Sequence, residues 1–94
     1  MAVARVVSFE GVDAQRMEQM KQEMREGDQP EDIPASEIVV LHDAEAEKSI
    51  VILFFENEGD YERGDAALNA MPAGDTPGRR TSVDKYNVAF RMTS

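Results

Sequence analysis

One stretch decides the fold: Ser49-Ile50-Val51-Ile52-Leu53-Phe54-Phe55-Glu56. Alternate side chains of a β-strand project to opposite faces of a sheet. One face would therefore carry Ile50, Ile52 and Phe54, and the other would carry Val51, Leu53 and Phe55. Each large apolar side chain left in water forfeits about 1.5–3 kcal/mol. Both faces need a cover, which predicts a strand in the middle of a sheet.

A second strand with two apolar faces is predicted at residues 3–9, where β-branched and aromatic residues precede Gly11. One face of this strand would carry Val3, Val7 and Phe9, and the other Ala4 and Val6. We therefore expect this strand to be central as well.

Two segments have the apolar spacing of helices. The first covers residues 13–26, with Asp13 as its N-cap and a stripe formed by Met17, Met20 and Met24. The second covers residues 60–71, where Asp60 is the expected cap and Pro72 closes the helix.

Two further strands complete the pattern. Residues 37–42 form an apolar run that leads, through a short connection, into residues 49–56, which indicates a hairpin. Residues 81–92 alternate between apolar and polar side chains. The last strand is therefore expected to pack one side against the protein, with the apolar set being Tyr86, Val88, Phe90 and Met92.

The order strand, helix, strand, strand, helix, strand within 94 residues predicts a single α+β domain over residues 1–94. It matches the ferredoxin-like βαββαβ unit, whose four-stranded antiparallel sheet runs 4-1-3-2 with both helices on one face. That order makes the two strands with two apolar faces central. Because the helices cover one face only, the other face predicts a homodimer in which two chains pack sheet against sheet.

Nearly the whole chain resembles the dimeric α+β barrel proteins, a group that includes antibiotic-biosynthesis-type monooxygenases, haem-degrading proteins and stress-responsive bacterial members. The likeness lies in residues 4–9, 33–41, 50–55, 64–71 and the closing Arg80-Thr81-Ser82-Val83-Asp84-Lys85-Tyr86. The resemblance implies that two ferredoxin-like chains form one barrel. It disfavours haem degradation here, because that activity uses a Trp and a helical His, whereas this chain has no Trp and its one His, His42, lies in a predicted strand.

Charge and composition exclude several classes of protein. Nineteen acidic and ten basic residues give a net charge of -9, which repels nucleic acid and anionic membranes. The absence of cysteine excludes disulfides, thiol nucleophiles and cysteine-ligated metals. The longest apolar run is far shorter than the roughly 20 residues that span a bilayer. These features predict a cytoplasmic protein without nucleic-acid or membrane partners.

Few residues in the chain point to chemistry. His42 is the only side chain with an unperturbed pKa near neutrality, which makes it the candidate general base. Tyr86, or one of the three asparagines Asn57, Asn69 and Asn87, could position a substrate by a hydrogen bond. Candidate ligand-binding residues are Met17, Met20, Met24 and Tyr61. For all of these the alternative is a structural or surface role.

Metal and cofactor motifs are incomplete. Asp43, Glu45 and Glu47 imitate the start of a calcium loop, but Lys48 and Phe54 stand where that loop needs glycine and glutamate. We therefore expect neither a metal nor a cofactor. The pair Arg79 and Arg80 could bind an anion or make surface contacts.

Three hypotheses of function remain. The leading one is a homodimer that holds a small apolar or aromatic molecule between sheet and helices. The first alternative is a cofactor-independent monooxygenase of electron-rich aromatics, with His42 as base and Tyr86 or an asparagine as positioning donor. The second is a structural or stress-associated dimerisation protein, which would have no pocket.

Overall fold

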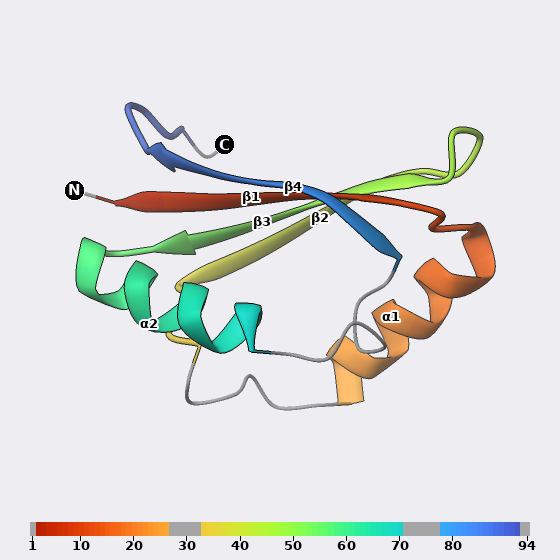
Figure 1. Ribbon diagram of the computed structural model, residues 1–94, viewed down its shortest axis with the longest axis horizontal. Coiled ribbons are helices and arrows are strands. Elements are labelled where there is room, and N and C mark those ends of the chain that lie inside the picture. The colour runs from red at the N-terminus through yellow and green to blue at the C-terminus, as the bar shows by residue number, and fades with distance from the viewer. Residues whose placement is uncertain (1, 27–32, 71–77, 93–94) are drawn as a thin grey trace.

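The predicted order of strands and helices is present in the computed structural model, which describes residues 2–26, 33–70 and 78–92. These residues form an α+β structure with two helices and a four-stranded sheet (Figure 1). Its elements are β1 (Val3–Glu10), α1 (Ala14–Glu26), β2 (Glu37–Asp43), β3 (Lys48–Phe55), α2 (Glu58–Asn69) and β4 (Arg79–Asn87).

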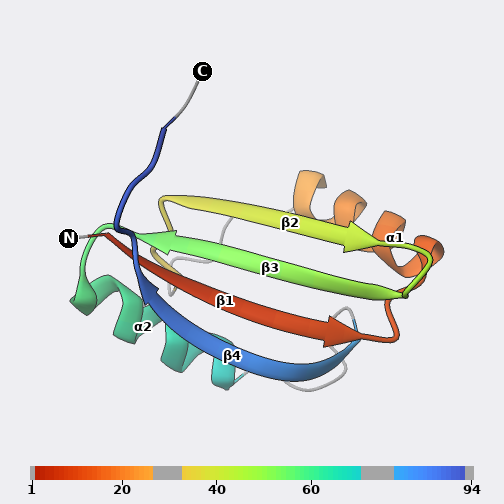
Figure 2. The same ribbon diagram turned by 90° about the horizontal axis from the view of Figure 1, so that it is seen from above.

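The sheet is antiparallel throughout and its strand order is β2-β3-β1-β4 (Figure 2). This confirms the predicted order, in which the two strands with apolar residues on both faces are central. Both helices lie beneath the same face of the sheet (Figure 1). The arrangement is compatible with the predicted ferredoxin-like fold. Within the described residues, no helix is both long enough and apolar enough to cross a membrane.

The core lies between the sheet and the helices, and it consists of two clusters. The cluster near α2 contains Val3, Ile33, Leu53, Phe55 and Tyr61. The cluster near α1 contains Val7, Phe9, Val12 and Met17. In both clusters the residues from β1 and β3 belong to one alternation set. The period of two read from the sequence therefore groups these side chains correctly, although it did not indicate which group the helices cover.

Both helix starts are capped by side chains, but one cap differs from the expectation. Asp13 Oδ1 accepts the Arg16 backbone N–H at 2.8 Å, which confirms Asp13 as the cap of α1. In α2 the cap is Asn57, whose Oδ1 accepts the Asp60 N–H at 2.8 Å. The prediction of Asp60 was wrong, because Asn57 caps the helix earlier and places Asp60 inside the first turn. Pro72, the expected closing residue, lies outside the described residues.

The last strand is shorter than predicted. Val3, the first residue of β1, pairs with Asn87, so β4 has no strand to pair with beyond that point. Residues 88–92 form a C-terminal tail that rises on the face opposite the helices (Figures 1 and 2). The expectation that the apolar set of this segment packs against the protein was wrong for three side chains, which are exposed: Tyr86, Phe90 and Met92.

The C-terminal tail is nevertheless held to its own sheet. The Val88 N–H donates to the Ala2 carbonyl at 2.9 Å. The Arg91 guanidinium lies 4.4 Å from the centre of the Phe54 ring and pairs with Glu37 at the start of β2. The tail therefore borders one end of the face that the helices leave free.

Candidate functional site

The sheet face away from the helices, here called the open face, keeps apolar side chains in contact with solvent. Leu41 is 50% exposed, Ile50 36% and Tyr86 56%. Ile52 and Phe54 are half-buried on the same face of β3. The chain's own helices therefore provide one of the two covers that the apolar strands need, as the sequence predicts.

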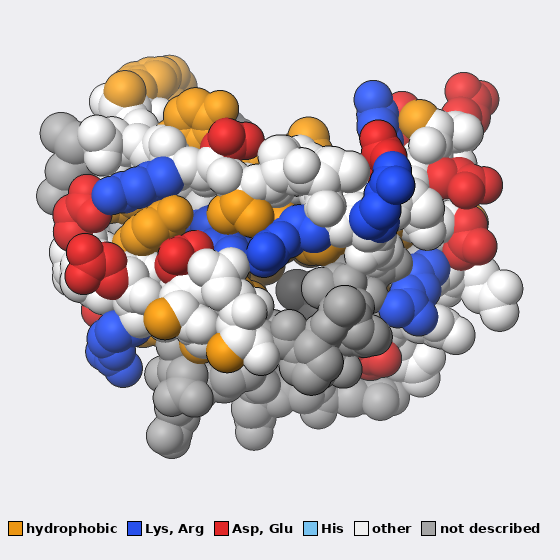
Figure 3. Space-filling model, viewed as in Figure 1, with side chains coloured by type: hydrophobic (Ala, Val, Ile, Leu, Met, Phe, Trp, Pro, Cys, Tyr) orange, Lys and Arg blue, Asp and Glu red, His pale blue; other side chains and the backbone are white. Residues whose placement is uncertain are grey.

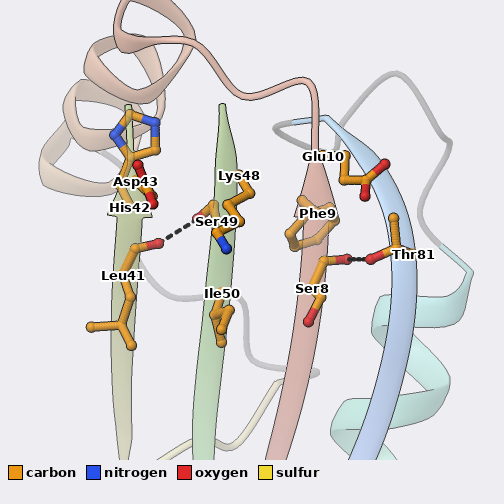
Figure 4. A pocket seen from close by; sticks show the side chains of 10 residues that line it. All are labelled: Ser8, Phe9, Glu10, Leu41, His42, Asp43, Lys48, Ser49, Ile50 and Thr81. Carbon is orange, nitrogen blue, oxygen red and sulfur yellow. Dashed lines mark hydrogen bonds between the residues drawn. The ribbon is translucent and has the colours of Figure 1, made fainter. Parts of the chain in front are cut away.

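A shallow hollow of about 350 Å³ lies at the end of the open face near the turn between β2 and β3 (Figure 4). Leu41 and Ile50 contribute apolar surface to it. Its polar rim includes the carboxylate of Glu10 and the ammonium of Lys48. The other lining residues are Ser8, Phe9, His42, Asp43, Ser49 and Thr81.

Two hydroxyls at the hollow are oriented by backbone carbonyls. Ser49 Oγ donates to the Leu41 carbonyl at 2.7 Å, and Thr81 Oγ1 donates to the Ser8 carbonyl at 3.2 Å (Figure 4). Ser49 is only 2% exposed and belongs to the covered face, so Thr81 is the one of these two hydroxyls that can still accept a hydrogen bond from a molecule in the hollow. An apolar surface with such an acceptor suits a small molecule with an apolar body and a polar substituent.

His42 is among the lining residues, but its side chain projects toward the face that the helices cover and is engaged there by the backbone. Its Nε2 is 2.9 Å from the Val12 carbonyl oxygen, which can only accept, so Nε2 carries a hydrogen. In the neutral ring, Nδ1 is then the basic nitrogen. Val12 is fully buried, so the contact with His42 also fixes the loop between β1 and α1 onto β2.

The two predicted catalytic residues do not come together. His42 pairs with Ser49, which pairs with Phe9, whereas Tyr86 pairs with Ala4. The offset of five residues along β1 separates them by about 16 Å in the strand direction. Their alternation also puts them on opposite faces of the sheet. A single small aromatic molecule therefore cannot contact both side chains.

The predicted ligand-binding residues lie on the helix side, away from the hollow. Met17 is buried in the cluster near α1, and Met20 packs against that cluster half-buried. The Met24 side chain lies outside what the structure describes. Tyr61 meets Phe55 edge-on, with 5.7 Å between ring centres, in the cluster near α2. Burial raises the pKa of the Tyr61 phenol above its ordinary 10.0.

An ion pair between a buried and a partly exposed side chain was not predicted from the sequence. Arg5 is only 2% exposed, and its Nε donates to Asp65 Oδ1 at 2.9 Å. Asn69 Oδ1 accepts from both Arg5 and Arg80, at 3.1 and 3.0 Å. Figure 3 shows basic side chains gathered between the sheet and α2. The alternation that places Val3 on the covered face also places Arg5 there, which was the available signal.

The remaining candidates have structural partners. Arg79 pairs with Glu10 and Arg80 with Asn69, so the two arginines of the predicted anion site contact different groups. Asn57 caps α2. Among the described residues, no group of three or more His, Asp or Glu side chains is placed to hold a metal ion.

No protein-family model matches the chain, and neither the curated proteins nor the solved structures yield a significant match. The structure itself therefore defines the class, an α+β protein with an open four-stranded antiparallel sheet.

Proposed function

We propose that the protein is a small-molecule-binding homodimer whose two chains pack through their open faces, as in dimeric α+β barrels. The observation that supports the proposal is the hollow of about 350 Å³ on a face with exposed apolar residues. From the sequence, a cavity is expected between the sheet and the helices. The hollow described here lies on the other face, where a second chain would close it.

The chemistry of the hollow favours a ligand with an apolar or aromatic body. Contact with Leu41 and Ile50 removes apolar surface from water, at about 25 cal/mol per Å². The hydroxyl of Thr81 can accept a hydrogen bond from a phenol or an alcohol. A second chain would exclude the remaining water and strengthen this polar contact.

Ligand binding can be tested by thermal denaturation with a panel of small phenols and indoles. A ligand whose free concentration is a hundred times its Kd stabilises the native state by about 2.7 kcal/mol, so the Tm rises. Ser8→Leu fills the hollow and should abolish the rise. Gln19→Leu, at an exposed position of α1 away from the open face, should retain it. The proposal is wrong if no compound raises the Tm, or if Ser8→Leu responds like the wild type.

The dimer is tested separately by light scattering over a dilution series. A species twice the chain mass of 10.5 kDa at micromolar concentration is expected. A chain that stays at 10.5 kDa would contradict the packing of open faces.

The position of His42 supports one alternative, a cofactor-independent monooxygenase of electron-rich aromatic compounds. Nδ1 would accept the phenolic proton, and the phenolate would supply electrons to dioxygen. Tyr86 is too distant to assist. Oxygen uptake with phenolic substrates, compared between the wild type and His42→Gln, tests this alternative. Glutamine retains a donor for the Val12 carbonyl, so lost uptake would reflect the lost base, and no uptake by either protein rejects the enzyme.

A further inference from the structure

Four charged residues form one row across the open face, at the end that carries the hollow. The register places Lys48 beside Asp43 on one side and beside Glu10 on the other, and Glu10 beside Arg79. From β2 to β4 the charges of this row are negative, positive, negative and positive. We call Asp43, Lys48, Glu10 and Arg79 the charged row.

We infer that the charged row docks onto the charged row of a second copy, about a two-fold axis that runs parallel to the strands between β3 and β1. This inference rests on the proposed dimer and adds its register. The axis reverses the strand order, so that β2 lies over the partner's β4 and β3 over the partner's β1. Asp43 then faces Arg79 of the partner subunit, and Lys48 faces Glu10 of the partner subunit. By symmetry, four opposite-charge contacts form.

The alternation of sign selects this register against its neighbours. A slip by one strand would place Asp43 opposite the partner's Glu10 and Lys48 opposite the partner's Lys48. Like charges brought together at an interface are strongly unfavourable. An axis across the strands would instead place the row over the other end of the sheet. That end is bordered by the C-terminal tail through Arg91, Phe54 and Glu37.

The sizes of the neighbouring side chains support the same axis. In the next row, β2 and β3 carry the large residues Leu41 and Ile50, whereas β1 and β4 carry the small residues Ser8 and Ser82. Reversing the strand order puts each large side chain over a small one. Packed sheets need such interdigitation at a spacing of about 10 Å.

The register also explains how the hollow would be completed. The hollow is lined by residues of all four strands, so it lies on both sides of the inferred axis (Figure 4). The hollows of the two copies would therefore face each other and form one chamber. Each half is open to solvent in a single chain, so the site is incomplete without the partner.

Rescue in trans distinguishes this docking from a role of the same charges within one chain. Lys48→Glu places two acidic side chains opposite each other, and Glu10→Lys places two basic ones. Each variant alone should dimerise roughly tenfold more weakly or worse in sedimentation velocity at low salt. In an equimolar mixture, the introduced glutamate of one chain would face the introduced lysine of the other. The heterodimer should therefore recover an affinity near that of the wild type.

Matched controls keep the experiment decisive. Lys21→Glu mixed with Glu62→Lys changes exposed charges on the two helices and should leave dimerisation unchanged. Should Glu10→Lys fail to fold by circular dichroism, Asp43→Arg mixed with Arg79→Glu tests the outer contacts in the same way. Wild-type dimers without rescue by either pair would overturn the register and leave the dimer intact. A monomeric wild type would overturn the proposed function as well.

Discussion

At the scale of single residues, Arg5 is the most constrained charge in the described chain. Its side chain is 3% exposed, whereas that of its partner Asp65 is 32% exposed. Water can therefore solvate Asp65 if Arg5 is lost, but it cannot reach Arg5 if Asp65 is lost. The two halves of the ion pair are thus expected to differ in what their removal costs.

Substitution of each partner tests this asymmetry. Asp65→Ala should lower the free energy of unfolding by roughly 3 kcal/mol, because it leaves the buried Arg5 guanidinium without its carboxylate partner. Arg5→Met should cost about 1 kcal/mol or less, since an apolar chain of similar length replaces the cation. Urea unfolding measures both. Arg63→Met, which removes the exposed pair with Asp60, serves as the control and should change stability by under about 0.5 kcal/mol. Equal losses for Asp65→Ala and Arg5→Met would contradict the burial argument.

Tyr61 predicts how stability responds to alkaline pH. Its pKa is raised by burial first and by Asp65 second, so the unfolded chain ionises at a lower pH than the folded one. The phenol's contribution is fully present below the unfolded pKa and is lost as the pH rises through the folded pKa. The urea midpoint should therefore fall as the pH rises above about 10.

The control for this prediction is Tyr61→Phe, which keeps the ring against Phe55 and removes the titrating group. Its urea midpoint should fall less steeply over the same pH range. Lys85 contributes a decline of the same sign, because its hydrogen bond to Glu58 raises its pKa. Only the difference between wild type and variant therefore reports Tyr61, and identical slopes would refute its role.

At the scale of elements, α2 lies against β3 through a glycine. A Cβ on Gly64 would come within 2.5 Å of Cε1 of Phe55, a ring that is fully buried. Gly64 is therefore required by packing, even though glycine is a poor residue inside a helix. The contact between Gly64 and the Phe55 ring therefore sets how closely α2 approaches β3.

Gly64→Ala should destabilise the protein by roughly 1–3 kcal/mol in thermal or urea unfolding, despite alanine's better helix propensity. Gly59→Ala, whose Cβ would meet Asn57 Oδ1 at 3.3 Å, should have a smaller effect. The double variant Gly64→Ala with Phe55→Leu should lose less stability than the sum of the two single losses, since both changes act on the same contact. A double variant whose loss equals the sum of the single losses would argue against the clash.

The sheet order could be predicted from the sequence because two strands, residues 3–9 and 49–56, carry apolar side chains on both faces. The end of β4 could not, because its alternation continues past Asn87 and only the start of β1 shows where pairing stops. The cap of α2 was ambiguous for a local reason: Asn57 and Asp60 are both good caps and lie three residues apart.

The candidate site was harder to predict than the fold. The hollow depends on four strands in register, and no sequence signal sets the register between strands that are not joined by a hairpin. His42 was identified correctly as a residue near a strand end, but its bond to the Val12 carbonyl needs the folded loop. Tyr86 was expected to pack and instead faces solvent, because it lies on the open face, which the helices do not cover.

At the scale of the whole molecule, one face of the sheet contributes to stability and the other to association and binding. The helix side holds both core clusters and the Arg5 pair, and it accounts for stability. The open face holds the hollow, the charged row and exposed apolar residues. Substitutions on the open face should therefore alter association and binding more than the unfolding of a single chain.

The hydrogen bond from Val88 to Ala2 has a consequence for labelling. It brings the beginning of the chain and its tail to the same end of a molecule that is 36 Å long, away from the hollow. A two-fold axis along the strands would keep the tails of both copies at one pole of the dimer. Donor and acceptor dyes on the tails of separate subunits would then exchange energy efficiently, whereas an axis across the strands would send them to opposite poles.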